Sequence, residues 1–268
     1  AMMFSSTIIG LKLLPTTILH HQHTGEVMIS VLLMQDLIAI LVLLGLHIAS
    51  VGNLTALQIG KLIFAFPVLL LVAYLMEKFV LVKLFTKFDR VQEYIFLLSI
   101  GWCLGMAELS SFMGLSAEIG AFLGGVAVAA SPIALYISES LKPLRDFFLV
   151  LFFFTIGAGF NLQYLPAVII PAAILAILML AIKPVVFKML LAKSKESTKV
   201  AWEVGVRLAQ VSEFSLLIAY LAASTQVINE STNYLIQATT ILTFIASSYI
   251  VVLKYPTPLA FSDKMRRD

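Results

Sequence analysis

Hydrophobic residues recur along this chain in long runs separated by short polar segments. There are nine such runs, at about residues 1–14, 27–49, 58–80, 92–112, 116–133, 146–162, 165–190, 201–224 and 233–254. A transmembrane helix needs about 20 mostly apolar residues. The pattern therefore predicts an all-α membrane protein with about nine spans, the first of which the chain enters partway.

The polar segments between the runs alternate in charge. Lys and Arg occur in segments 81–91, 134–145 and 191–200 and after residue 253, whereas segments 50–57, 113–115, 163–164 and 225–232 contain neither. Basic residues favour the cytoplasmic side of a membrane. We therefore expect a transmembrane domain over residues 1–254, starting from the outer half of the membrane, and a cytoplasmic tail over residues 255–268. The mixed segment 137–148, ISESLKPLRDFF, is expected to form an interfacial linker helix.

Composition agrees with this class and removes others. Hydrophobic residues make up 60% of the 268 positions, charged residues 12%, and the net charge of +3 comes from the loops. Nothing in this charge distribution indicates nucleic-acid binding. Cys103 is the single cysteine, so no disulfide framework is expected. The sequence has no P-loop, dinucleotide motif, zinc-ligand spacing or nucleophile elbow, and an enzyme is therefore not predicted.

Asp36 lies in the middle of the second apolar run, next to Gln35. A carboxylate at the centre of a spanning helix costs at least ~2.5 kcal/mol, and such residues are usually functional. We interpret Asp36 as a site that holds either a proton or a monovalent cation. The alternative is a buried acid that neighbouring helices satisfy without any role in transport.

Lys183 is the second candidate, since it lies inside the seventh run beside Pro184. A proline kinks a helix and would aim Lys183 at the interior of the bundle, where it would oppose Asp36 across a cavity. The alternative is a lysine that extends to the cytoplasmic interface.

A polar cluster interrupts the eighth run at Arg207, Gln210, Ser212 and Glu213. This cluster suits a helix that unwinds within the membrane, where freed backbone groups must find partners inside the protein. The alternative is a structural ion pair between Arg207 and Glu213.

Three hydroxyl residues, Ser5, Ser6 and Thr7, lie together in the first run. Hydroxyls and freed carbonyls are oxygen ligands of the kind that alkali ions accept. Bonding back to helix carbonyls is the alternative for such residues.

These motifs together resemble the monovalent cation:proton antiporter-2 family, especially its Kef-type potassium/proton branch. The resemblance rests on the order of FSSTIIGLKLL, LLMQDLIAI, LSAEIGAFLGGVAVAAS, LKPLRDFFLVLFFFTIGAGFNL, AIKPVVFK and RLAQVSEFSLLIA, and it covers essentially the whole chain. The family's common GEF reads SEF here.

The resemblance implies a sodium/proton-antiporter-like helical bundle with inverted repeats and two broken helices that cross at mid-membrane. Ser5, Ser6 and Thr7 would lie at the first crossover, and Gln210 to Glu213 at the second. Asp36 would be the essential carboxylate and Lys183 its positive partner. Family members have 12 or 13 spans and act as homodimers, so the first three or four spans would precede this sequence. The branch also implies a bacterial inner membrane.

The expected activity is exchange of a monovalent cation for a proton by alternating access at Asp36, with Gln35, Ser6 and Thr7 as further ion-binding residues. Gln35 cannot carry a proton, which predicts electroneutral exchange. Its amide also lowers the field strength of the site and favours K⁺ over Na⁺, and no cofactor is expected. The alternatives are a Na⁺/H⁺ antiporter, a channel-like or ligand-gated K⁺ efflux pathway without obligatory proton coupling, and a non-transporting sensor or scaffold.

Overall fold

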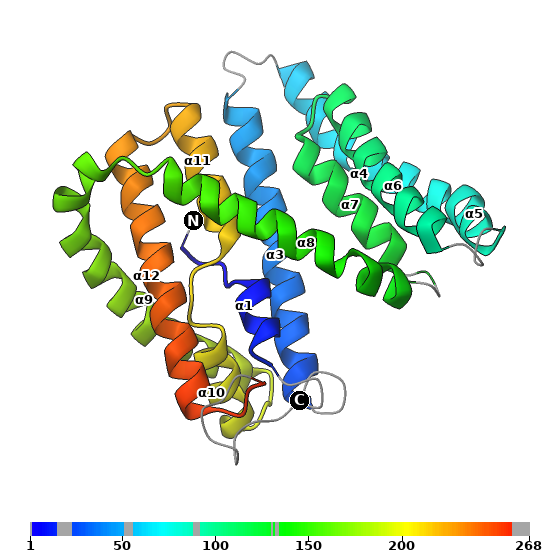
Figure 1. Ribbon diagram of the computed structural model, residues 1–268. Helices are drawn as coiled ribbons and strands as arrows, with labels where there is room; N and C mark the ends of the chain where they lie inside the picture. Colours follow the sequence, from blue (N-terminus) through cyan, green and yellow to red (C-terminus); the bar gives the residue numbers. More distant parts are fainter. Residues whose placement is uncertain are drawn as a thin grey trace. The chain divides into compact units, whose positions relative to one another are not determined.

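The computed structural model describes residues 2–14, 23–50, 56–87, 92–129, 131 and 134–258. Within these ranges the chain forms helices and no β-strand, which confirms the prediction of an all-α protein (Figure 1). In chain order the helices are α1 (Thr7–Lys12), α3 (His23–Ser50), α4 (Ala56–Met76), the π-helix η1 (Glu77–Leu81), α5 (Val82–Lys87), α6 (Gln92–Phe112), α7 (Ala117–Ala129), α8 (Ala134–Ala158), the 3₁₀ turn η2 (Leu162–Tyr164), α9 (Leu165–Lys193), α10 (Thr198–Arg207), α11 (Glu213–Ser224) and α12 (Glu230–Lys254).

In the described part of the chain, five helical stretches are long and apolar enough to cross a bilayer. They are His23–Leu46, Phe64–Phe85, Glu93–Phe112, Leu162–Lys193 and Glu230–Lys254. Large apolar side chains point outward from them, as on α9, where Ile170 and Ile177 are each 68% exposed. Apolar surface of this extent is stable in lipid and not in water. The chain is therefore an integral membrane protein.

The remaining predicted runs take other forms. The first run contains only the short helix α1, and the fifth contains α7, whose 13 residues span about 20 Å. The eighth run divides into α10 and α11. Residues 137–148, where an interfacial linker helix is expected, are helical, but they belong to the longer helix α8, which continues to Ala158. Pro143 lies inside α8 without ending it.

Helix starts in the C-terminal part follow ordinary capping chemistry. The side chains of Ser197, Ser212 and Asn229 accept hydrogen bonds from backbone N–H groups in the first turns of α10, α11 and α12. Such caps satisfy donors that a helix start leaves free. They fix where each of these helices begins.

The chain divides into two compact units, and the first combines residues 1–39 with residues 161–268. In this unit α9 packs along both α10 and α12, and α11 packs along α12 (Figure 1). Its apolar core joins Met28 and Leu32 of α3 to Phe187 of α9 and to Val204 and Leu208 at the end of α10. This core holds α3 against α9 and α10.

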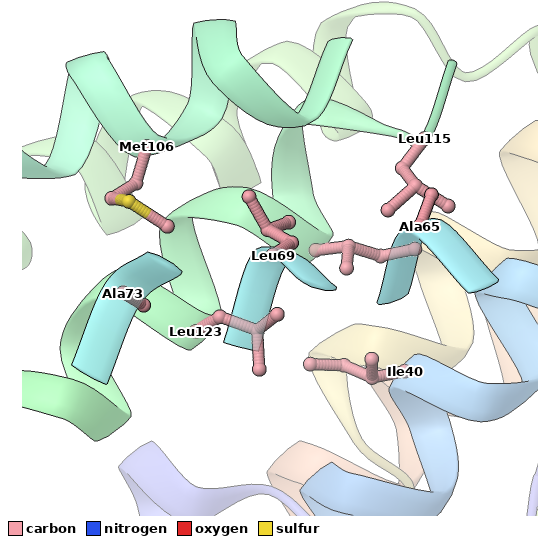
Figure 2. Close-up of a cluster of buried hydrophobic side chains, with 8 residues drawn as sticks. Ile40, Ala65, Leu69, Ala73, Met106, Leu115 and Leu123 are labelled. Atoms are coloured by element: carbon pink, nitrogen blue, oxygen red, sulfur yellow. The ribbon is translucent and has the colours of Figure 1, made fainter. Parts of the chain in front are cut away.

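The second unit covers residues 40–160. Its main core packs Ile40, Ala65, Leu69, Ala73, Met106, Leu115, Ile119 and Leu123 together, as Figure 2 shows for seven of them. Helices α6 and α7 approach closely at Gly120, where an added Cβ would lie 2.2 Å from the carbonyl oxygen of Met106. Trp102 Nε1 donates to the carbonyl of Gly124 at 2.9 Å. The small residues Gly120 and Gly124 thus allow the backbones of α6 and α7 to pack closely.

Candidate ion and proton site

Two stretches of non-helical backbone lie next to each other in the first unit. One is Phe4–Ser6, before α1, and the other is Leu208–Ser212, between α10 and α11 (Figure 1). The break at 208–212 confirms the predicted unwinding of the eighth run. Non-helical backbone inside a membrane must find its hydrogen-bond partners within the protein. The partners of these two stretches define the candidate site.

Lys183 on α9 joins the two stretches. Its Nζ donates to the carbonyl of Phe4 at 3.0 Å and to the carbonyl of Gln210 at 2.6 Å, and the side chain is buried. The alternative of a lysine extending to the interface is therefore wrong. The expected pairing with Asp36 is not found either, because among the described residues no ion pair joins Lys183 to a carboxylate. The unwound carbonyls lack helical donors and take the ammonium group instead.

Serine and glutamine side chains complete the link between the two stretches. Ser5 Oγ donates to the carbonyl of Leu208 at 2.7 Å, and Ser5 N donates to Gln35 Oε1 on α3 at 2.9 Å. Gln210 is fully buried, and its Nε2 donates to the carbonyl of Ser6 at 3.4 Å. The oxygen of Gln35 thus already holds a backbone group in this conformation.

The hydroxyl residues of the first run serve the site and do not bond back to helix carbonyls. Ser6 Oγ accepts from Ile9 N and so caps α1, while Thr7 Oγ1 donates to Glu213 Oε1 at 3.0 Å. Glu213 is the first residue of α11 and follows its cap, Ser212. Thr7 and Glu213 therefore connect the starts of α1 and α11.

Asp36 completes the set from α3. Its side chain is partly exposed, and it makes no hydrogen bond or ion pair within the described ranges. Its carboxyl group interacts electrostatically with Glu213. Two acidic groups thus share this part of the unit, and neither has a cationic side chain as its partner in the described structure.

Arg207 lies apart from these acids. Its Nε donates to Glu203 at 2.9 Å, and its two terminal nitrogens donate to the carbonyls of Leu13 and Pro256. The guanidinium group also lies 5.1 Å from the centre of the Tyr255 ring. The predicted alternative of an ion pair between Arg207 and Glu213 is wrong, since the break after Arg207 separates the two side chains. Arg207 fastens α10 to the end of α1 and to the segment after α12.

Sequence reasoning missed the contribution of α12. Ser247 Oγ donates to Gln210 Oε1 at 3.0 Å, and Val211 N donates to Thr243 Oγ1 at 3.1 Å. A signal was present, because Thr239, Thr240, Thr243 and Ser247 place hydroxyls within an apolar helix at roughly helical spacing. All four are buried. Thr243 and Ser247 bond to the unwound segment, whereas Thr239 and Thr240 donate to carbonyls of their own helix.

A cavity of about 360 Å³ reaches the site. Its walls are mostly apolar and include Met2, Met3 and Met179, with Gln35 and Lys183 as the polar lining residues. Gln35 and Lys183 are therefore accessible from a hollow between the first segment, α3 and α9.

Comparison with known proteins assigns the family. Residues 1–253 match the model of the sodium/hydrogen exchanger transmembrane domain. K(+) efflux antiporter 4 of Arabidopsis thaliana is 30% identical over 265 residues, covering 93% of this chain and 43% of the relative. K(+) efflux antiporter 5 of the same plant is 29% identical over 261 residues, covering 93% and 45%. The putative K(+) efflux antiporter KefB of Alkalimonas amylolytica is 27% identical over 252 residues, covering 92% and 38%.

The chain thus spans less than half the length of these relatives. The family consists of transporters and not of enzymes, and the expected Kef-type resemblance is confirmed by the relatives found. Because the family model matches nearly the whole length of the chain, the chain belongs to the sodium/hydrogen exchanger family of membrane proteins.

Proposed function

We propose that this chain forms the part of a cation:proton antiporter that exchanges a monovalent cation for a proton at Asp36. The observation that carries the proposal is the state of that carboxylate. It lies within the apolar helix α3, beside two unwound segments, and no side chain in the described ranges neutralises it. A group in this position favours a bound positive charge, and a proton and a metal ion compete for the same oxygens.

The surrounding geometry supports alternating occupation. Unwound backbone in membrane transporters typically lines the substrate site. Here Lys183, Ser5 and Gln210 tie the two unwound segments together, so this backbone is held in place before an ion arrives. A preorganised site of this kind binds a dehydrated ion at a lower entropic cost.

Potassium is the proposed substrate, and the exchange is one for one. The names of the relatives include K(+) efflux antiporters, and Gln35 beside Asp36 supplies an amide that carries no proton. Each bound cation then displaces one proton from Asp36, and the cycle moves no net charge. An imposed membrane potential should leave the rate unchanged.

Further features of the proposal concern the setting of the site. We place residues 1–254 in one transmembrane domain and residues 255–268 in a cytoplasmic tail, as the Lys and Arg distribution favours. A homodimer in a bacterial inner membrane follows from the Kef-type resemblance. Cysteine crosslinking in cells would test the homodimer, and accessibility labelling in cells would test the cytoplasmic position of the tail.

The direct test is proton movement in liposomes that contain the protein at its full natural length and a trapped pH dye. Potassium or sodium is added after a proton gradient is imposed, with wild type, Asp36→Asn and the control Glu118→Gln. Glu118 is exposed at the start of α7, so this control removes a carboxylate away from the site. We expect cation-driven proton movement in wild type and Glu118→Gln, and none in Asp36→Asn.

Other outcomes identify the alternatives. The cation with the lower half-saturation concentration is the substrate, so a lower value for sodium makes this a Na⁺/H⁺ antiporter. Cation flux without proton movement indicates a channel-like pathway. Unchanged function in Asp36→Asn removes Asp36 from the mechanism and favours a sensor or scaffold.

A further inference from the structure

Glu213 has an unused carboxylate oxygen beside the proposed site. Its Oε1 accepts the hydroxyl of Thr7 at 3.0 Å, whereas its Oε2 is buried and has no hydrogen-bond donor among the described residues. A buried acceptor without a donor is unfavourable, and more so when it is charged. Such an oxygen is stable when a positively charged group binds it.

Glu213 is held at the start of α11. It occupies the first turn of this 12-residue helix, where the positive end of the helix dipole attracts negative charge. The Thr7 hydroxyl donates to Oε1 of the same carboxyl group. These contacts fix the orientation of the side chain.

No cation of the protein is available to this oxygen in the described structure. Lys183 is held by the carbonyls of Phe4 and Gln210, and Arg207 is held by Glu203 and two further carbonyls. Asp36 is a second acidic group, and it interacts electrostatically with Glu213. A cation that contacts both carboxyl groups offsets the repulsion between them.

We propose that Glu213 is a second acidic residue that contacts the transported cation, with Oε2 as the contacting atom. This inference rests on the proposed exchange at Asp36 and adds a second cation ligand to it. Asp36 alternates between proton and cation, while Glu213 contributes a carboxylate oxygen that strengthens cation binding. Only Asp36 exchanges a proton in this proposal, so the one-for-one exchange is preserved.

The expected effect follows from Coulomb's law. At the effective dielectric constant of a protein, an opposite unit charge a few Å from a bound ion can raise the binding affinity by about tenfold or more. Replacing Glu213 with Gln keeps the shape and the bond to Thr7 but removes the charge. We expect Glu213→Gln to bind rubidium ion, a tracer for potassium, at least about tenfold more weakly than wild type.

The experiment measures equilibrium binding of radioactive rubidium ion to the purified full-length protein, together with rubidium-driven proton release. Glu118→Gln is the matched control, because it removes an exposed carboxylate at the start of α7, outside the site. Wild type and Glu118→Gln should bind alike. Glu213→Gln should bind weakly yet still release protons at high rubidium concentration, and Asp36→Asn should do neither.

Binding by Glu213→Gln within twofold of wild type would overturn the proposal and leave Glu213 as a link between α1 and α11. Rubidium binding and proton release that persist in Asp36→Asn would overturn the proposed exchange instead, so the two failures are distinguishable. If Glu213→Gln does not fold, Thr7→Val tests the same point by removing the hydroxyl that positions Glu213. We expect about threefold weaker binding in Thr7→Val, and unchanged binding in that variant counts against the proposal.

Discussion

Lys183→Met should destabilise the protein strongly even though it removes a buried charge. The ammonium group donates to the carbonyls of Phe4 and Gln210. Hydrogen bonds to a charged group contribute about 1.5–3 kcal/mol each, which gives roughly 3–6 kcal/mol for the two. Removing the ammonium recovers part of its desolvation penalty. The expected net loss is about 2–4 kcal/mol in the free energy of unfolding.

Thermal melting of the purified full-length protein measures this loss. For a domain of about 150–250 residues, 1 kcal/mol lowers the melting temperature by about 2–4 °C, so the domain that contains Lys183→Met should melt about 10 °C below wild type. Lys193→Met is the control, because Lys193 is an exposed residue in the last turn of the same helix. Its change should stay within about 0.5 kcal/mol. Equal melting temperatures for the two variants would refute the assignment of Lys183 to the two carbonyls.

A double-mutant cycle with Asp36→Asn separates this role from direct charge pairing. Since Lys183 bonds to carbonyls and Asp36 has no cationic partner in the described ranges, the two substitutions should add within about 0.5 kcal/mol. A coupling energy above about 1 kcal/mol would show that the two side chains pair in solution. That result would restore the expectation drawn from the sequence.

Two further predictions concern packing and the buried guanidinium. Gly120→Ala should destabilise the protein by about 1–3 kcal/mol, because the added methyl group overpacks against Met106. Gly125→Ala is the control and should be neutral or slightly stabilising, since no atom lies within 4 Å of the added Cβ. Similar melting temperatures for the two variants would contradict the close approach of α6 and α7. Arg207→Met should cost about 3–5 kcal/mol because it leaves the Glu203 carboxylate without its partner. Exposed Arg145→Met should not change the melting temperature, and an equally small shift in Arg207→Met would refute the anchoring role.

Long apolar runs with few charges fixed the larger helices of this protein from sequence alone. Helices α3, α6, α9 and α12 match predicted runs because a spanning helix needs only length and apolar side chains. The break after α10 was also predictable, since charged and amide side chains cannot face lipid in a continuous helix. These are local properties, and a sequence displays them directly.

The partners of Lys183 were not predictable in this way. The ammonium group bonds to backbone carbonyls, and every residue in the chain carries one, so no residue type marks the acceptor. Phe4 is separated from Lys183 by 179 positions. The sequence shows an acid and a base in membrane helices and favours pairing them, whereas the structure gives the base to the unwound backbone.

The continuous helix α8 illustrates a second limit. Residues 137–148 mix charged and apolar side chains around Pro143, a composition that indicates an interface. The helix nevertheless continues through Pro143 to Ala158. A proline removes one backbone hydrogen bond but does not fix where a helix must end when the flanking residues are good helix formers.

The division of charges within the first unit explains why its acids remain open to an ion. Lys183 donates to the carbonyls of Phe4 and Gln210 in the two non-helical stretches. Arg207 donates to the carbonyls of Leu13, at the end of α1, and Pro256, after α12. Their hydrogen bonds are therefore used to hold irregular backbone, which otherwise would be unstable in a membrane. Asp36 and Glu213 consequently keep oxygens that the described chain does not satisfy. Suppose that a substitution gave the carbonyls of Phe4 and Gln210 another hydrogen-bond donor and so released Lys183. The ammonium group could then compete with the transported cation for the acidic side chains. Cation affinity should fall while the fold remains intact.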